Sequence, residues 1–170
     1  MLSKKHPQFK KAIFLDRDGV INKKPARGEY VKNWKEFEFL PGAIKALKIL
    51  CQKGFEIYII TNQAGIGRGF MSEQDLKIIH QELEKELEKQ DVKISGIYYC
   101  PHEMRENCGC RKPKPGLFFQ AAKEHNLDLK KVIFIGDDWR DSGAGLSAEC
   151  ETILAGKEKN LLQIVNSLLN

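Results

Sequence analysis

The feature of this chain that most constrains its fold is a regular alternation of short apolar runs with longer amphipathic stretches. Short apolar runs bounded by polar and turn residues predict strands that are buried in a sheet. Stretches with apolar residues three or four positions apart predict helices with one buried face. The expected strands are Ala12–Leu15, Glu56–Ile60, Ile94–Tyr99, Val132–Ile135 and Thr152–Leu154.

Helices are expected between these strands. Pro41 opens the first helix, which ends at Gly54, and Ser72 caps the second. The third begins at Pro115, and two more cover Trp139–Ala148 and Leu161–Leu169. The apolar positions that define the first three are Ile44, Leu47 and Cys51, then Leu76, Ile79, Leu83 and Leu87, then Phe118, Ala121 and Ala122.

Strands that alternate with helices are joined by right-handed crossovers, which produce a mostly parallel sheet with helices on both faces. We therefore expect an α/β fold, a Rossmann-like three-layer sandwich. A chain of 170 residues fits one such domain, over residues 1–170. In a parallel sheet, ligands bind outside the carboxyl ends of the strands. The expected ends are Leu15, Ile60, Tyr99, Ile135 and Leu154.

Charge and hydropathy exclude several classes of protein. No apolar run approaches the roughly 20 residues of a membrane span, and Met1–Lys11 lacks the apolar segment of a secretory signal. The net charge of +5 suits an anionic ligand, but no basic run exceeds two residues, which does not favour nucleic-acid binding. We expect a cytoplasmic monomer that binds a small anionic molecule and neither nucleic acid nor a membrane.

Polar residues follow three of the expected strands. Asp16 and Asp18 come directly after the first strand, and residues two apart in extended chain point the same way. Such a pair can also cap a helix or form a turn. Thr61, Asn62 and Gln63 precede a glycine-rich stretch at 64–69, whose free N–H groups suit a phosphate. Three further carboxylates, Asp137, Asp138 and Asp141, follow the fourth strand.

Carboxylates gathered at one edge repel each other unless a cation neutralises them, and oxygen ligands with open positions favour Mg²⁺. The set is suited to phosphoryl transfer. Asp16 would attack phosphorus as a nucleophile, and Asp18 would protonate the leaving oxygen and then activate water. Mg²⁺ and Lys112 would keep Asp16 ionised and offset the charge of the phosphoryl group. Phosphoacceptor receiver domains also gather Asp, Thr and Lys at strand ends, but they need no second Asp at this spacing.

Four strings resemble, in order, the motifs of the haloacid dehalogenase-like (HAD) phosphatase superfamily: FLDRDGVIN, ITNQ, the lysine of CRKPKPG, and GDDWRD. The resemblance implies a Rossmann-like fold, here with no long cap insertion. It implies that Asp16 is the nucleophile, Asp18 the general acid and base, Thr61 a phosphoryl ligand and Lys112 the group that orients the phosphoryl group. It also implies that Asp16, the Asp18 carbonyl and Asp137 hold Mg²⁺.

Three thiols and one imidazole lie within a short loop, at Cys100, His102, Cys108 and Cys110. This Cys₃His set is complete for a closed, tetrahedral Zn²⁺ site. We therefore expect a structural zinc that stabilises the loop and so positions Arg111 and Lys112. The two other cysteines, Cys51 and Cys150, are expected to be small buried residues. The remaining histidines, His6, His80 and His125, show no pattern that indicates a role.

The zinc loop resembles that of two groups in the superfamily, the D-glycero-D-manno-heptose 1,7-bisphosphate 7-phosphatases and the histidinol-phosphate phosphatases. The strings GIGRG at Gly65–Gly69, RKPKPGL at Arg111–Leu117 and EYV at Glu29–Val31 favour the first. This resemblance implies removal of the 7-phosphate of a heptose bisphosphate, a step toward surface glycans such as lipopolysaccharide. Asn62 and Gln63 would line the phosphate pocket. Arg111 would hold the second phosphate, with Arg27 or Arg68 as helpers.

Overall fold

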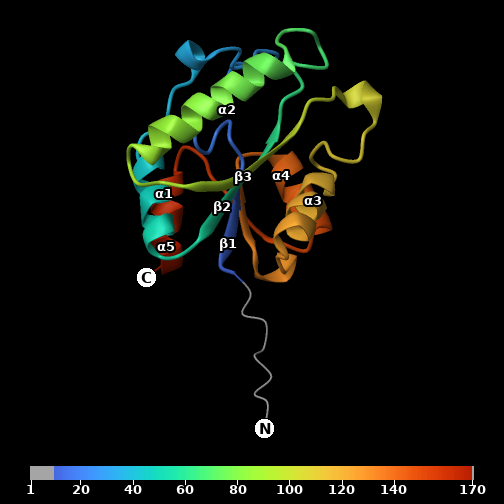
Figure 1. Ribbon diagram of the computed structural model, residues 1–170. Helices are drawn as coiled ribbons and strands as arrows, with labels where there is room; N and C mark the ends of the chain where they lie inside the picture. Colours follow the sequence, from blue (N-terminus) through green and yellow to red (C-terminus); the bar gives the residue numbers. More distant parts are fainter. Residues whose placement is uncertain (1–9, 170) are drawn as a thin grey trace.

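The structure is a computed structural model that describes residues 10–169, so His6 and most of Met1–Lys11 lie outside the described part of the chain. Its centre is a parallel sheet of five strands in the order β3-β2-β1-β4-β5 (Figure 1). The strands are β1 (Ala12–Leu15), β2 (Glu56–Asn62), β3 (Ile94–Cys100), β4 (Ile133–Gly136) and β5 (Glu151–Leu154). The α/β sandwich with a parallel sheet, expected from the alternation of apolar runs, is confirmed.

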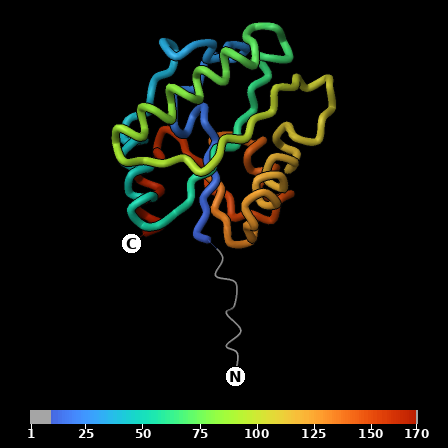
Figure 2. The backbone as a smooth tube through the Cα atoms, viewed as in Figure 1, coloured from blue at the N-terminus to red at the C-terminus, as the bar shows by residue number. Residues whose placement is uncertain are grey.

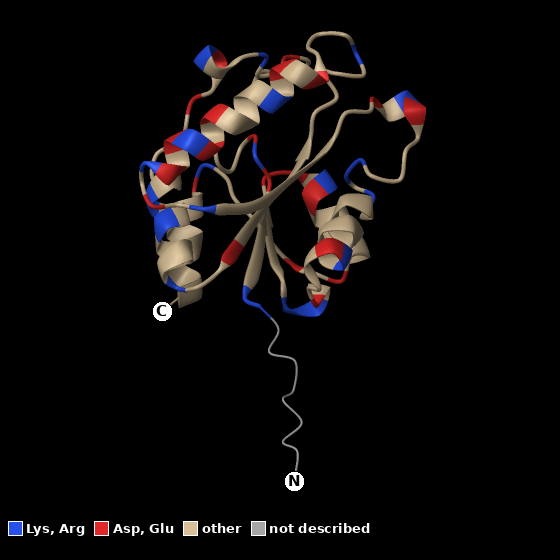
Figure 3. Cartoon of the chain, in the orientation of Figure 1, with Lys and Arg blue, Asp and Glu red and all other residues tan. Residues whose placement is uncertain are grey.

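The helices lie on both faces of the sheet. One layer contains α1 (Ala43–Gln52), α2 (Glu73–Glu88) and α5 (Leu161–Leu169), and the other contains α3 (Gly116–His125) and α4 (Trp139–Ser147). Charged residues are found mainly in the helices and loops, while the strands carry few of them (Figure 3). No helix among residues 10–169 is long and apolar enough to cross a membrane.

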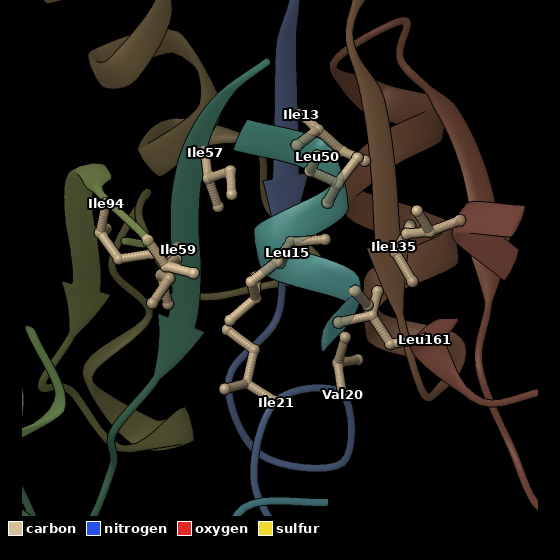
Figure 4. Close-up of a cluster of buried hydrophobic side chains, with 14 of the residues drawn as sticks. Ile13, Leu15, Val20, Ile21, Leu50, Ile57, Ile59, Ile94, Ile135 and Leu161 are labelled. Carbon is tan, nitrogen blue, oxygen red and sulfur yellow. The ribbon is translucent and has the colours of Figure 1, made fainter. Parts of the chain in front are cut away.

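Successive side chains of β1 point to opposite faces of the sheet, so they belong to two separate core clusters. Ile13 and Leu15 face the layer of α1 and α5, where they meet Leu50 and Leu161 (Figure 4). Phe14, between them in sequence, faces α3 and α4. Because β1 is central and covered on both faces, all four of its residues are buried, which explains its unbroken apolar sequence.

Capping and turn residues in the sequence explain where α2 begins and where α1 ends. Ser72 caps α2 through a capping box with Asp75, in which each side chain accepts from the backbone N–H of the other residue. Gly54 closes the turn after α1 at φ +79°, a conformation that glycine adopts without strain. Cys150 is buried as expected, but Cys51 is only partly buried, because it lies on the last turn of α1.

The structure differs from the expected elements in two respects. Strands β2 and β3 run on to Asn62 and Cys100, so these residues are held in the sheet rather than in loops. Three short 3₁₀ helices, Trp34–Glu36, Met104–Glu106 and Leu129–Lys131, were not expected, since a single turn carries no periodic signal. The loops that follow β1, β2 and β3 all extend beyond the same edge of the sheet (Figure 2).

Candidate active site

A cavity of about 690 Å³ opens at the carboxyl edge of the sheet. Its walls come from the ends of β1 and β2, the loop at 24–30, the cysteine-containing loop and the start of α4. The lining residues that carry charge or an amide are Asp16, Asp18, Lys24, Arg27, Glu29, Asn62, Arg68, Arg111, Lys112, Asp138, Arg140 and Asp141. The sheet thus brings together groups that the sequence places at or after the ends of four different strands, β1 to β4.

Asp16 directly follows β1 and is almost fully buried. Its Oδ1 accepts from the backbone N–H of Arg17 at 2.7 Å and lies 3.0 Å from the Lys112 ammonium. Burial raises the pKa of Asp16 to about 7; Lys112 opposes the rise, and the nearby Asp141 and Asp18 carboxylates add to it. A buried carboxylate with this many negative neighbours gains from any further cation at the site.

Lys112 is the buried cation of the site, with 2% of its surface exposed. Its ammonium has three protons, and three acceptors surround it: Asp16 Oδ1 at 3.0 Å, Asp141 Oδ1 at 2.7 Å and the Ile60 carbonyl at 2.8 Å. Asn62 fixes the same residue by its backbone, since the Asn62 amide accepts from Lys112 N–H and donates to Lys112 C=O. Hydrogen bonds to β2 therefore hold Lys112 in place, and its ammonium lies between the Asp16 and Asp141 carboxylates.

Asp18 is held by donors on three residues, two from the stretch after β1 and one from the end of β2. The Arg17 guanidinium approaches both of its oxygens, Asn22 Nδ2 donates to Oδ1 at 2.8 Å, and Gln63 Nε2 donates to Oδ2 at 2.9 Å. Burial opposes ionisation, but Arg17 and these hydrogen bonds hold the pKa of Asp18 below its usual value. Gly19, at φ +95°, lets the chain turn next to Asp137, where a Cβ would lie 2.2 Å from Asp137 Oδ2.

Three carboxylates surround the start of α4. Asp138 caps the helix, and Asp141 Oδ2 accepts from the backbone N–H groups of Asp137 and Asp138. Close packing makes glycine necessary at 136, because a Cβ there would lie 2.2 Å from the Asp141 Cβ. Lys24 donates to Asp137 at 2.7 Å and to Asp138 at 3.0 Å, and Arg140 also pairs with Asp138.

Asp16, Asp137 and Asp141 form a group that fits a hard cation. One oxygen from each lies within 4.8 Å of the others, and burial raises the pKa of Asp137 despite the nearby Lys24. Carboxylate oxygens at this spacing, with an open cavity beside them, suit Mg²⁺. The ligands expected from the sequence were Asp16, the Asp18 carbonyl and Asp137. The side chain of Asp141 belongs to this group as well.

The second cluster contains the four residues expected to hold zinc. Sulfur atoms of Cys100, Cys108 and Cys110 lie 3.3–3.5 Å apart, and His102 Nδ1 lies 3.5 Å from the first and 3.3 Å from the last. Tetrahedral zinc with Zn–S bonds of about 2.3 Å would separate its sulfur ligands by about 3.8 Å. The cluster therefore fits a four-ligand metal site with little adjustment.

The cysteine cluster also supports the cavity wall. Arg111 follows Cys110 and donates to the His102 carbonyl at 3.2 Å. The glycine-rich loop after β2 lies against this segment, because Gly67 N–H donates to the Pro101 carbonyl at 2.9 Å. A side chain at Gly67 would meet the backbone N of Glu103 at 2.9 Å, so the close approach requires glycine.

Most of the residues expected to act in catalysis or to bind substrate or Mg²⁺ line the cavity, but Thr61, Gln63 and Asp137 do not. Thr61 and Gln63 are buried, and Gln63 Nε2 donates to Thr61 Oγ1 at 2.9 Å as well as to Asp18. Gln63 therefore contacts the Asp18 carboxylate instead of lining the cavity. No role was expected from the sequence for Arg17 or Asn22. Arg17 and Asn22 lie inside the FLDRDGVIN string, which was the one available signal.

A parallel sheet with paired carboxylates after β1, a buried lysine and an acidic helix start at one edge defines a hydrolase of the phosphoryl-transfer type. The family model described as haloacid dehalogenase-like hydrolase matches residues 14–149, and the chain belongs to this family.

Relatives with assigned activities cover nearly the whole chain. A D-glycero-alpha-D-manno-heptose-1,7-bisphosphate 7-phosphatase of Campylobacter jejuni is 41% identical over 92% of this chain and 94% of its own length. A D-glycero-beta-D-manno-heptose-1,7-bisphosphate 7-phosphatase of Helicobacter pylori is 43% identical over 93% and 86%. The crystal structure of a D,D-heptose 1,7-bisphosphate phosphatase from B. bronchiseptica, complexed with magnesium and phosphate, is 30% identical. It matches 94% of this chain and 98% of its own with a TM-score of 0.86.

Proposed function

We propose that this protein is a Mg²⁺-dependent phosphatase that removes the 7-phosphate of D-glycero-D-manno-heptose 1,7-bisphosphate through an aspartyl-phosphate. The observation that carries the proposal is the buried Asp16, held by Lys112 at 3.0 Å and facing a cavity with several arginines. The names of the C. jejuni, H. pylori and B. bronchiseptica relatives support the choice of substrate. The enzyme would act in the cytoplasm as a monomer, on a small phosphorylated sugar.

The chain's own residues account for both half-reactions. An Asp16 oxygen forms a bond to phosphorus while the bond from phosphorus to the sugar oxygen breaks. Asp18, an ionised carboxylate in the free enzyme, would take up a proton from solvent as the anionic substrate binds beside it, and it donates that proton to the sugar oxygen. Asp18 then takes a proton from water, whose oxygen attacks phosphorus and releases Asp16 and inorganic phosphate. Mg²⁺ held by Asp16, Asp137 and Asp141 would offset the negative charge of the phosphoryl group. Lys112 favours the ionised form of Asp16 before it attacks and again when it is released.

The roles of the two loops follow from their positions. Zn²⁺ at Cys100, His102, Cys108 and Cys110 would be structural, because four protein ligands leave no position open for substrate. It would hold Arg111 at the cavity. Arg27, Arg68 and Arg111 all line the cavity, and their guanidinium groups could bind a second phosphate.

The nucleophile is tested by Asp16→Asn, which cannot form the aspartyl-phosphate. We expect a folded protein by circular dichroism whose kcat on heptose 1,7-bisphosphate is lower by several orders of magnitude. Turnover near that of the wild type would refute the covalent mechanism. Asp18→Asn is expected to be severe as well, because it removes both proton-transfer steps.

The substrate is tested by Arg111→Ala, assayed on heptose 1,7-bisphosphate and on p-nitrophenyl phosphate. Loss of a charge-assisted contact to the second phosphate should cost about 2–3 kcal/mol in kcat/KM on the bisphosphate, roughly 30- to 150-fold, and far less on the monophosphate. Arg105→Ala is the matched control, since Arg105 lies in the same loop with 89% of its side chain exposed. Both anomers and histidinol phosphate belong in the panel, and a preference for histidinol phosphate would replace the proposed substrate.

A further inference from the structure

Arg17, between the two catalytic carboxylates in sequence, is a fully buried arginine, with no exposed surface. Its guanidinium points at Asp18, with Nε at 3.3 Å and Nη2 at 3.1 Å from Oδ1, and Nη2 at 3.2 Å from Oδ2. The ring of Phe37 lies 5.8 Å from the guanidinium carbon. A guanidinium buried this deeply needs acceptors for its N–H groups, because each unpaired donor is costly.

The remaining terminal nitrogen of Arg17 finds its acceptor on α2. Arg17 Nη1 lies 3.1 Å from Nε2 of His80, a residue buried on the inner side of that helix. Arginine only donates, so His80 Nε2 is the acceptor and the ring carries its proton on Nδ1. Burial and the positive charge of Arg17 lower the pKa of His80 to about 3, with Asp18 acting in the opposite direction. The ring is therefore neutral at neutral pH.

These contacts form a chain from a helix to the catalytic acid. His80 accepts from Nη1 of the Arg17 guanidinium, and the Nη2 side of the same planar group pairs with Asp18. The two oxygens of Asp18 also accept from Asn22 and Gln63. A planar guanidinium transmits orientation, because its nitrogens cannot move independently. If His80 no longer accepts from Nη1, Arg17 must turn to find another acceptor, and its contacts with Asp18 change with it.

We propose that His80 is a positioning residue for catalysis, which acts through Arg17 to hold Asp18 in the orientation that protonates the leaving oxygen. The inference rests on the proposed function, since it assigns a role within the same reaction. It gives α2 a part in the chemistry although no residue of this helix lines the cavity.

Leaving-group dependence separates a positioning role from a merely structural one. p-Nitrophenolate leaves without a proton, whereas a sugar alkoxide needs one, so only the second reaction requires a well-placed acid. The ratio kcat/KM reports the steps up to departure of the leaving group, which is the half-reaction in which Asp18 is the acid. A defect in Asp18 orientation should lower kcat/KM on the sugar phosphate and leave that on p-nitrophenyl phosphate nearly unchanged.

The test compares His80→Leu, which removes the acceptor, with His80→Gln, whose amide oxygen can replace it. We expect His80→Leu to lose about 10- to 100-fold in kcat/KM on heptose 1,7-bisphosphate and less than about 3-fold on p-nitrophenyl phosphate. His80→Gln should recover most of the loss. Leu83→Ala is the matched control, because Leu83 is buried in the main core on the same helix and its loss should affect both substrates equally. Equal losses for His80→Leu on the two substrates would overturn the inference.

Two further measurements keep the outcomes distinct. Asp18→Asn should show the same leaving-group dependence. If Asp18→Asn shows no leaving-group dependence, Asp18 is not the acid, and both the proposed mechanism and this inference are overturned. If Asp18→Asn shows the dependence and His80→Leu does not, only the inference about His80 is overturned. Should His80→Leu fail to fold, nitrogen NMR of the wild-type ring still decides. A neutral ring protonated at Nδ1 supports the inference, and one protonated at Nε2 refutes it, because Nε2 could not then accept from Arg17.

Discussion

Replacing His80 should change how the stability of this protein depends on pH. The ring is neutral in the folded protein at neutral pH, because burial and the Arg17 guanidinium lower its pKa from 6.5 to about 3. In the unfolded chain the ring regains an ordinary pKa near 6.5. Between these two values the unfolded state binds one proton more than the folded state, so the free energy of unfolding falls as the pH falls.

The size of the effect follows from the two pKa values. At pH 7.5 both states are almost unprotonated at His80, and its contribution is close to zero. At pH 5.5 the unfolded ring is mostly protonated and the folded ring is not, which costs about 1.4 kcal/mol of stability. The loss continues until the pH reaches the folded pKa of about 3 and is complete below it.

The assay is urea unfolding of the wild type and of His80→Gln at pH 7.5 and pH 5.5, with the same metal content. Glutamine does not titrate, and the other histidines are common to both proteins, so their contributions cancel. The wild type should lose about 1.4 kcal/mol more than the variant over this interval. Equal losses would show that His80 titrates alike in the folded and unfolded states, and would refute the neutral, buried acceptor.

Three other perturbations have definite expected results. Cys108→Ser should lose the bound zinc by elemental analysis and lower the melting temperature, whereas Cys51→Ser, outside the cluster, should keep the zinc; a metal-free wild type with an unchanged melting temperature would contradict the structural role. Gly145→Ala should cost about 1–3 kcal/mol in urea unfolding, because its Cβ would lie 1.8 Å from Thr152 Oγ1, and adding Thr152→Ala should restore most of the loss. Mg²⁺ should raise the melting temperature of the wild type and raise that of Asp137→Asn much less; equal shifts would exclude Asp137 as a ligand.

The order of strands and helices follows from the sequence alone because it is encoded locally. Apolar runs such as Ala12–Leu15 indicate strands that are covered on both faces, and the capping pair Ser72 and Asp75 marks the start of a helix. The rule that parallel strands gather their carboxyl ends at one edge then brings Asp16 and Asp137 together without knowledge of any contact. The four zinc-ligand candidates were identifiable for a similar reason, since they lie within eleven residues, 100–110.

What only the tertiary structure decided are the contacts between segments far apart in the sequence. Arg17 and His80 are separated by 63 residues, and Asn62 and Lys112 by 50. No periodicity or spacing links such pairs, because their meeting depends on how α2 and the cysteine loop pack over the ends of β1 and β2. Gln63 illustrates the limit: its type and position suggested a cavity-lining group, yet packing at the strand end turned its amide toward Asp18. Sequence placed the reacting groups at one edge of the sheet, and long-range packing determined which donor holds each of them.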